Sequence, residues 1–189
     1  MIHPTAVVDS GARIGRDVTV GPYTVIDANV EIGDHCVIGP RVTVTGWTGI
    51  GARTKIYSGA SIGEEPQDLS FGGGESYTRI GEDCILREYV TVHRGAKPGT
   101  ATRLGNGVML MAFAHIGHNC LLDDHVILAN MSILGGHVEV GESAFFSACV
   151  MVHQFCRVGR RAMIGGSSLL PQDVPPFCLV GRHLVEGPN

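Results

Sequence analysis

The sequence of 189 residues is 44% hydrophobic but only 17% charged and 6% aromatic, and its formal net charge is −4. So many apolar and so few charged residues exclude an intrinsically disordered chain, and the acidic balance argues against a nucleic-acid binder. No apolar run approaches the roughly 20 residues that span a bilayer, and the N-terminus lacks the cationic and apolar regions of a signal peptide. We therefore expect a cytoplasmic protein that does not span a membrane.

A six-residue repeat organises the sequence from its first residues onward. Stepping by six from Ile2 gives an aliphatic residue every time as far as residue 62, and the same apolar register returns over residues 80–92 and 104–170. Glycine often follows the apolar residue, as in Ile14-Gly15, and allows the positive φ that a tight corner requires. A period of six fits neither an α-helix nor a long strand, and it indicates a short strand and a corner, repeated.

The repeat resembles that of the hexapeptide-repeat family, which implies a left-handed parallel β-helix of triangular cross-section. In that fold three hexads form one coil, residues 18 apart stack, and about nine coils enclose an aliphatic core. We predict an all-β solenoid over residues 1–172, with two loops at about 64–79 and 94–103, where the register breaks. Because prolines follow and proline lacks a ladder donor, residues 173–189 are expected to form a short irregular tail.

Stacking by 18 residues places several histidines at one corner of the predicted prism. The hexads that begin at Ile116, Leu134 and Val152 lie over one another, so that His118 is aligned with Gly136. The other histidines on this edge are His115, His137 and His153. Since neighbouring strands lie about 4.8 Å apart, these side chains are predicted to form one cluster.

Such a cluster has three interpretations: exposed histidines at tolerant corners, a metal site of three imidazoles, or a catalytic base with groups that orient a substrate. We favour the base, because imidazole titrates near neutral pH and because Gly136 would expose a backbone N–H that could stabilise an oxyanion. His115 and His118 have two residues between them, unlike the zinc ligands of the hexapeptide-repeat carbonic anhydrase. We therefore predict no metal.

Six segments, in order along the chain, resemble the acyl-carrier-protein–UDP-N-acetylglucosamine O-acyltransferase family, which starts lipid A biosynthesis. They are Gln67-Asp68-Leu69, Thr91-Val92-His93-Arg94-Gly95, His115-Ile116-Gly117-His118-Asn119-Cys120, Gly135-Gly136-His137, Val152-His153-Gln154-Phe155-Cys156 and Gln172-Asp173-Val174-Pro175-Pro176. The match extends over nearly the whole sequence, loops included. It implies a homotrimer whose active sites lie between neighbouring prisms.

The resemblance also implies a reaction, in which a (3R)-hydroxyacyl chain moves from acyl carrier protein to the 3-hydroxyl of UDP-N-acetylglucosamine. His118 would be the general base and the N–H of Gly136 the oxyanion donor. No cofactor is implied, since acyl carrier protein and the sugar nucleotide are both substrates. The residues that match family positions near the sugar nucleotide and the acyl chain are Gln67, Asp68, His115, His137, His153, Gln154 and Gly166.

The sequence differs from the family pattern in three respects. Asn119 follows the base where aspartate is common, and it can orient an imidazole but cannot stabilise imidazolium by charge. Ser70 stands where lysine is common, which removes one possible phosphate contact. The sequence ends before the helical domain with which the family continues, and three arginines are either a partial substitute for its carrier-protein surface or ordinary solvated side chains. They are Arg157, Arg160 and Arg161.

Two other functions stay open. The protein could acylate another UDP-amino sugar, including at an amine, where the product would be an amide. It could also be a non-catalytic hexapeptide scaffold. A scaffold has no need of a histidine that faces a glycine N–H, so the pairing of His118 with Gly136 separates the enzyme from the scaffold.

Overall fold

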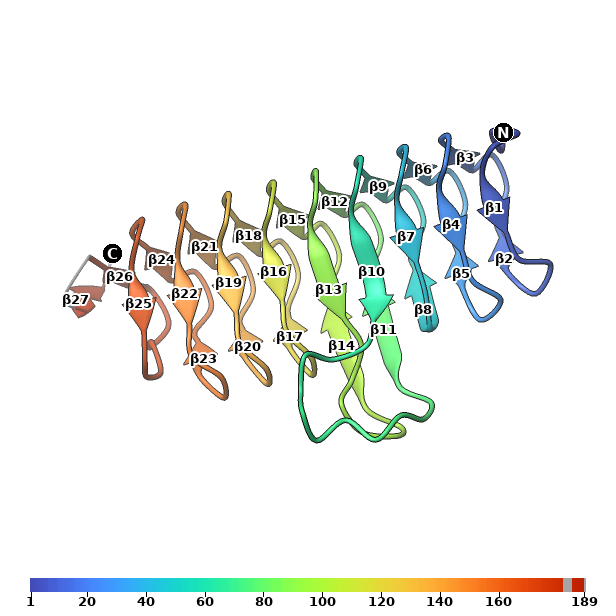
Figure 1. Ribbon diagram of the computed structural model, residues 1–189. Helices are drawn as coiled ribbons and strands as arrows, with labels where there is room; N and C mark the ends of the chain where they lie inside the picture. Colours follow the sequence, from blue (N-terminus) through green and yellow to red (C-terminus); the bar gives the residue numbers. More distant parts are fainter. Residues whose placement is uncertain (182–184, 189) are drawn as a thin grey trace.

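The computed structural model describes residues 1–181 and 185–188, and within them every regular element is a β-strand. Most strands contain only two residues, because each hexad turns a corner after one extended pair. The first residue of the pair points outward and the second points into the core, as in Thr19–Val20 and Val25–Ile26. The chain winds as the predicted left-handed parallel β-helix, from one end of the prism to the other (Figure 1).

Three sheets form the faces of the prism, and we call them A, B and C. Sheet A contains β3 (Thr19–Val20), β6 (Val37–Ile38), β9 (Lys55–Ile56), β12 (Ile85–Leu86), β15 (Met109–Leu110), β18 (Ile127–Leu128), β21 (Phe145–Phe146), β24 (Met163–Ile164), β26 (Cys178–Val180) and the antiparallel β27 (Val185–Pro188). Sheet B contains β1 (Val7–Val8), β4 (Val25–Ile26), β7 (Thr43–Val44), β10 (Ser61–Glu64), β13 (Thr91–His93), β16 (His115–Ile116), β19 (Ile133–Leu134), β22 (Met151–Val152) and β25 (Leu169–Leu170). Sheet C contains β2 (Arg13–Ile14), β5 (Glu31–Ile32), β8 (Trp47–Ile50), β11 (Tyr77–Ile80), β14 (Ala101–Leu104), β17 (Leu121–Leu122), β20 (Glu139–Val140) and β23 (Arg157–Val158).

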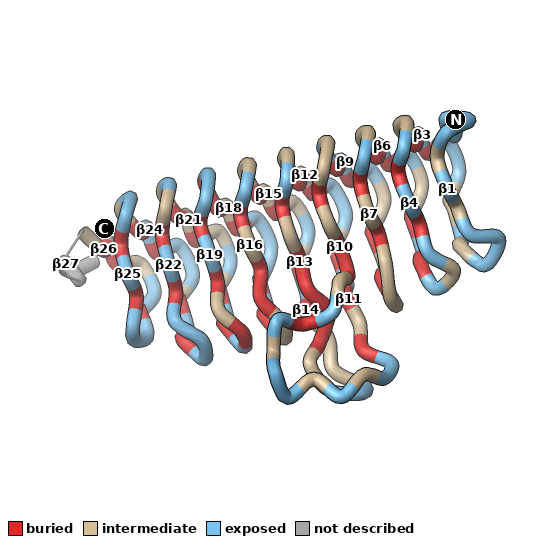
Figure 2. The backbone as a smooth tube through the Cα atoms, in the orientation of Figure 1, coloured by how far each residue is buried: buried red, intermediate tan, exposed pale blue. Residues whose placement is uncertain are grey.

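The core is one continuous cluster of apolar side chains inside the triangle, and buried residues recur in coil after coil along the prism (Figure 2). Ile62, Leu128 and Phe146 are fully buried there. Truncating one of these to alanine would cost about 2–5 kcal/mol, because a close-packed interior refills a cavity only partly. Since each coil packs mainly on its neighbours, the same residue types can serve at every level of the prism.

The strand register confirms the predicted stacking. His115 pairs with Ile133, and Ile133 pairs with Met151, each 18 residues further along. At the corners, the backbone of one coil also bonds to the next: the N–H of His137 donates to the carbonyl of His118 at 2.9 Å. His137 has a φ of 62°, in the left-handed region, and this ladder holds it there. Side chains at successive corners are therefore fixed above one another.

Two loops leave the prism near its middle (Figure 1). The first covers residues 65–76 between β10 and β11, and the second covers residues 94–100 between β13 and β14. Tyr77–Ile80 pairs with Ala101–Leu104 as the chain returns from each loop, so the strands continue outward beyond the usual two residues. Both loops start from sheet B and end on sheet C.

The ladder also continues past residue 172, where an irregular tail was predicted. Val174 forms a bridge with Val158, and Leu179 and Val180 of β26 pair with Met163 and Ile164 of β24. Pro175 and Pro176 do not interrupt this pairing, because they lie in the corner between the paired residues, where no ladder donor is needed. The part of the predicted tail at residues 182–184 and 189 lies outside the described residues. In the described part of the chain, no helix has the length and apolarity needed to cross a bilayer.

Candidate active site

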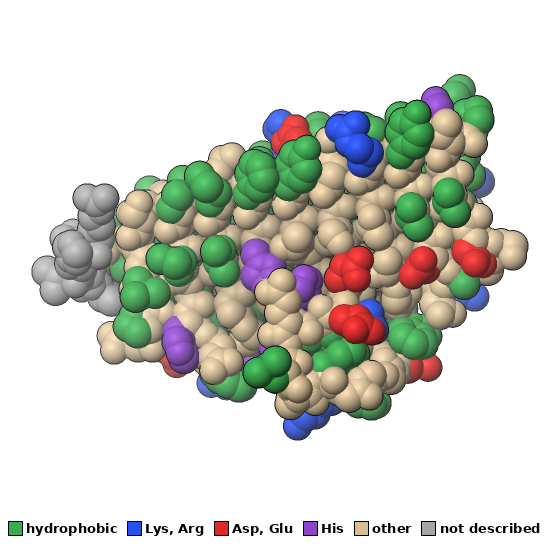
Figure 3. All heavy atoms as spheres, viewed as in Figure 1, with side chains coloured by type: hydrophobic (Ala, Val, Ile, Leu, Met, Phe, Trp, Pro, Cys, Tyr) green, Lys and Arg blue, Asp and Glu red, His purple; other side chains and the backbone are tan. Residues whose placement is uncertain are grey.

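The predicted histidines lie at the edge between sheets B and C, which we call the B–C corner. After β16, the residues Gly117, His118 and Asn119 turn the chain toward β17, and one coil further on Gly136 and His137 make the same turn toward β20. Both loops begin at this corner in the two preceding coils. Histidine side chains gather beside them on the face seen in Figure 3.

His118 is the centre of the cluster. Its side chain is only 14% exposed, and its Nε2 lies 3.9 Å from Oδ2 of Asp68. Its ring meets that of His137 edge to face, with 5.2 Å between the ring centroids. The structure therefore brings together three residues that the sequence predicted for the site, from two coils and one loop.

Asn119 determines which nitrogen of His118 carries the proton. The Oδ1 atom of Asn119 accepts a hydrogen bond from the N–H of Ala96 at 2.9 Å and lies 3.0 Å from Nδ1 of His118. Because this oxygen can only accept, Nδ1 must be the donor, and the neutral imidazole then has an unprotonated Nε2. The free nitrogen is the one that faces Asp68.

Gly136 leaves the space that the His118 ring occupies. A Cβ atom on residue 136 would lie 2.6 Å from both Cε1 and Nε2 of His118, which is closer than real contacts allow. Among residues 1–181, the N–H of Gly136 meets no hydrogen-bond acceptor. The corner thus combines an oriented base with an unused backbone donor in the adjacent coil, as oxyanion stabilisation requires.

Asp68 reaches the corner from the loop at 65–76. Its Oδ1 atom accepts hydrogen bonds from both the N–H and the hydroxyl of Ser70, each at 2.8 Å. These bonds, together with the nearby imidazoles of His118 and His137, hold the pKa of the Asp68 carboxyl below its usual value. The carboxylate is therefore charged at neutral pH. Gln67 lies beside it and is exposed on the same loop.

His115 and His93 form a second, mostly buried pair. His115 Nδ1 lies 2.7 Å from the hydroxyl of Thr91, and the two imidazole rings meet edge to face with 5.0 Å between centroids. Burial, followed by the charge of the neighbouring histidines, lowers the pKa of His93 to about 4. Burial and the charge of His118 also lower the pKa of His115. Both rings are therefore neutral at pH 7.

His93 was not part of the predicted cluster. Counting by 18 places it elsewhere, because the loop at 94–100 lengthens its coil: Thr91 pairs with His115, 24 residues away. Pairing the strands on either side of the loop, instead of counting residues, would have found it. His93 is only 7% exposed, so it belongs to the buried wall of the site.

His137 is the exposed side of the cluster. Its ring stacks on Phe155 of the next coil at 4.8 Å, with an interplanar angle of 17°. Partial burial, then the charges of His118 and Lys97, lower its pKa. Like the buried pair, it is therefore an uncharged hydrogen-bonding group at neutral pH.

Three predicted residues lie away from His118 within one chain. His153 and Gln154 are exposed one coil beyond His137, where His153 Nδ1 contacts the Gln154 carbonyl at 3.1 Å. Gly166 lies at the corner between sheets A and B, beside the carbonyl of Ala148. In the described residues, no group of three or more His, Cys, Asp or Glu side chains is placed to hold a metal ion.

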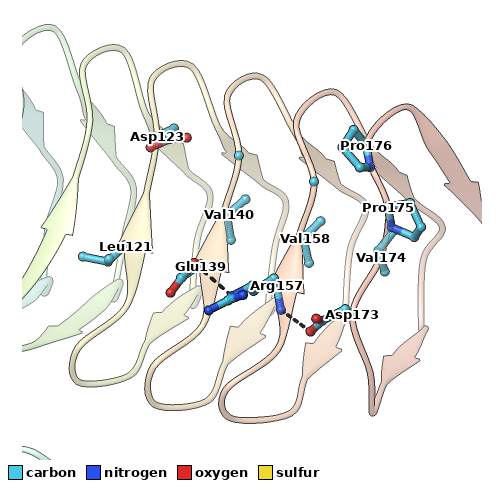
Figure 4. A pocket seen from close by; sticks show the side chains of 12 residues that line it. Leu121, Asp123, Glu139, Val140, Arg157, Val158, Asp173, Val174, Pro175 and Pro176 are labelled. Carbon is cyan, nitrogen blue, oxygen red and sulfur yellow. Dashed lines mark hydrogen bonds and ion pairs between the residues drawn. The ribbon is translucent and has the colours of Figure 1, made fainter.

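Two of the three arginines considered as a carrier-protein surface, Arg157 and Arg160, contact neighbours on their own chain. The Arg157 guanidinium lies 3.2 Å from Oε2 of Glu139, and the Arg157 backbone N–H donates to Asp173 at 2.7 Å (Figure 4). Arg160 lies over the ring of Phe177, 4.9 Å from its centroid. These contacts join the last coils of sheet C, beside the recess drawn in Figure 4.

Comparisons with known proteins agree with the repeat and the fold. The sequence family described as "Bacterial transferase hexapeptide (six repeats)" matches residues 11–46 and 101–136. An "Acyl-[acyl-carrier-protein]--UDP-N-acetylglucosamine O-acyltransferase" from Synechocystis sp. is 49% identical over 95% of this chain and 65% of its own length. The protein of the same name from Aliarcobacter butzleri is 42% identical over 100% of this chain and 74% of its own length. The chain thus spans less than two thirds of the Synechocystis relative.

Solved structures give the same picture. A UDP-N-acetylglucosamine acyltransferase from Campylobacter jejuni superimposes with a TM-score of 0.94 at 37% sequence identity, over 99% of this chain and 74% of that one. The Arabidopsis UDP-N-acetylglucosamine acyltransferase superimposes with a TM-score of 0.86 at 34% identity, over 100% of this chain and 74% of that one. The similarity therefore extends over nearly the whole chain.

Proposed function

The chain belongs to the acyl-[acyl-carrier-protein]–UDP-N-acetylglucosamine O-acyltransferase family, and we propose that it transfers a (3R)-hydroxyacyl chain from acyl carrier protein to the 3-hydroxyl of UDP-N-acetylglucosamine. This is the first step of lipid A biosynthesis. The observation that carries the proposal is the geometry of His118. Its Nδ1 is tied to Asn119, its Nε2 is free, and Gly136 offers an N–H in the adjacent coil.

The proposed reaction needs one base and one oxyanion donor. Nε2 of His118 takes the proton of the sugar 3-hydroxyl as the oxygen attacks the thioester carbon. The negative charge that develops on the thioester oxygen is stabilised by the N–H of Gly136, a contribution of roughly 3 kcal/mol for such donors elsewhere. When the intermediate collapses, the C–S bond breaks and the imidazolium returns its proton to the leaving sulfur, so that ester and free thiol are formed.

The surrounding residues have properties that suit a sugar nucleotide. His93, His115 and His137 are neutral at pH 7, so they can exchange hydrogen bonds with hydroxyl and amide groups without placing extra positive charge beside the base. Asp68 remains ionised and accepts hydrogen bonds only. We assign Gln67, Asp68, His115 and His137 to sugar-nucleotide binding.

A homotrimer with sites between prisms completes the proposal. Exposed apolar side chains form a row along sheet B and a ridge at the corner between sheets A and B. Contiguous exposed apolar residues of this kind are typical of a protein–protein interface. They include Val7, Val25, Ile133, Met151, Leu169, Tyr23, Tyr89, Phe113 and Met131. Gly166 lies at the corner between sheets A and B, whereas His153 and Gln154 lie at the B–C corner. In this proposal the three residues line the acyl-chain channel together only where two prisms meet.

The direct test is acyl transfer by the purified chain. We expect incubation with 3-hydroxyacyl carrier proteins of several chain lengths and UDP-N-acetylglucosamine to give a sugar product heavier by one acyl group, detected by mass spectrometry, and alkali-labile as an ester. Transfer only to a 3-amino sugar nucleotide, with an alkali-stable amide product, would favour the amide-forming alternative. If neither acceptor gives a product, the result contradicts the proposed acyltransferase activity and favours the non-catalytic scaffold. The cytoplasmic location and the lack of a cofactor stay predictions, the latter checked by activity after metal chelation.

A further inference from the structure

Arg94 carries a buried charge that has no role in the reaction proposed above. It follows β13 directly and is the first residue of the loop at 94–100. The residue is only 8% exposed, and its side chain only 10%. Removing a guanidinium from water costs free energy unless its N–H groups form hydrogen bonds with other partners. The burial of Arg94 therefore needs a structural explanation.

The partners of Arg94 lie at the end of β10 and in the 65–76 loop that follows it. Nη1 donates to the carbonyl of Gly63 at 3.1 Å, and Nη2 donates to Oε1 of Glu65 at 3.1 Å. The guanidinium lies 5.4 Å from the ring centroid of Phe71, in the middle of that loop. The Arg94 backbone N–H donates to the carbonyl of Glu64 at 3.0 Å. Arg94 thus contacts the last residues of β10, the first residue of the loop and the loop interior.

Two glycines in earlier coils make room for this arrangement. Gly46, with a φ of +60°, would place a Cβ 3.3 Å from both Cδ and Nη1 of Arg94. Gly63, with a φ of +87°, aims its carbonyl at the guanidinium, and a Cβ there would lie 2.1 Å from the hydroxyl of Thr48. The arginine is therefore built into the corner across several coils.

Arg94 lies where the two loops that hold His118 come together. From the loop at 65–76, Asp68 faces Nε2 of His118. From the loop that Arg94 itself begins, the Ala96 N–H binds the Asn119 oxygen that accepts from Nδ1. We propose that Arg94 is a positioning residue: it anchors the 65–76 loop on the prism and so sets Asp68 against the base. Its effect on catalysis rests on the proposed function, whereas the anchoring does not.

Hydrogen exchange measured by mass spectrometry tests the anchoring without any substrate. In Arg94→Met, which keeps the length of the side chain, we expect amides of residues 65–76 to exchange at least about tenfold faster, while the coils at 19–56 are unchanged. The matched control is Arg79→Met. Arg79 also donates to a carbonyl, that of Trp47 at 2.9 Å, and lies over an aromatic ring, that of Tyr77, but within the described residues no hydrogen bond or ion pair joins its side chain to the 65–76 loop.

Glu65→Gln removes the ion pair but leaves the carbonyl contact of Arg94, so it serves if Arg94→Met does not fold. We expect it to speed exchange in the same loop by a smaller factor. Loop exchange that is unchanged in these variants, or equally fast in Arg79→Met, would overturn the proposal.

A double-mutant cycle with Asp68→Ala tests whether Arg94 acts through Asp68. We expect Arg94→Met to lower kcat/KM by about 10- to 100-fold in the native background, as misplacement of a site group by about 1 Å can do. In the Asp68→Ala background it should lower kcat/KM by less than about threefold, because the group that it positions is already gone. Effects that multiply would show that Arg94 acts elsewhere. If the native chain transfers no acyl group, the proposed function fails and hydrogen exchange alone decides the anchoring.

Discussion

Two corners of the prism are built from the same turn but have different surroundings. The corner between sheets C and A, which we call the C–A corner, carries His35 and His125 with φ values of 60° and 59°. His137 at the B–C corner has a φ of 62°. A histidine with left-handed backbone conformation thus occurs at both corners of this solenoid, and by itself it does not indicate a functional site.

The difference lies in the residue before it and in the loops. At the C–A corner the N–H of Arg16 donates to Oδ1 of Asp34 in the next coil at 2.8 Å, and that of Asn106 donates to Asp124 at 2.7 Å. At the turn position of Asp34 and Asp124, the B–C corner has Gly136, which has no side chain to accept a bond of this kind from the preceding coil. The two loops then cover this corner. A glycine where the C–A corner has aspartate, together with the loops that shelter the histidines, is what separates the B–C corner from the C–A corner.

Replacing the histidines at the two corners gives the largest expected contrast. His118→Ala removes the base, and we expect kcat to fall by about 10²- to 10⁴-fold with unchanged oligomeric state and melting temperature. His125→Ala, at the C–A corner, should leave kcat within about twofold, since it contacts no part of the site. Steady-state kinetics and thermal melts provide both readouts. A near-normal rate in His118→Ala would show that another group is the base.

A side chain at position 136 should remove the difference that the glycine makes between the two corners. In Gly136→Ala the new methyl group occupies the place of the His118 ring, so the base must move, and we expect kcat/KM to fall by about 10- to 100-fold. Gly49→Ala is the matched control, because its Cβ would meet Arg79 only at an ordinary 3.4 Å. Equal activity of the two variants would mean that the close approach of residues 136 and 118 does not matter.

The buried histidines make the B–C corner sensitive to acid. The folded protein binds a proton at His93 only near pH 4, whereas the unfolded chain binds it near pH 6.5, so stability is lost as the pH falls through this window. The loss is up to about 1.4 kcal/mol per pH unit for this residue. Urea unfolding at pH 7 and pH 5 should show a smaller decline for His93→Gln than for the native chain. An equal decline in the free energy of unfolding of the two proteins would show that His93 is not the source of the acid sensitivity.

The smallest effect is expected from the ion pairs of the C–A corner. Arg53 contacts Asp83 at 2.8 Å and also pairs with Glu82, but all three side chains are at least half exposed. Arg53→Ala should therefore lower the free energy of unfolding by less than about 1 kcal/mol and leave kcat unchanged. A loss of several kcal/mol would mean that this corner is held together by charge rather than by its backbone ladder.

The repeat alone predicted most of the fold and half of the site. The aliphatic residue at every sixth position specifies the coil, and within the unbroken stretch from 104 to 170 the spacing of 18 stacks His118 under Gly136 and Asn119 under His137. Stacked residues are nearest neighbours in a regular array, so counting residues is enough to find them. The end of the ladder was misjudged, because the prolines that suggested a stop lie in a corner.

Only the tertiary structure decided what the loops contribute. The approach of Asp68 to His118, the link from Ala96 through Asn119 and the burial of His93 and Arg94 all depend on how two irregular segments fold back on the prism. No period relates those residues to the corner, since the loops change the separation of paired residues from 18 to 24 and 30. The sequence by itself therefore determined the prism and the stacked part of the candidate site, whereas loop packing determined how His118 is oriented and enclosed.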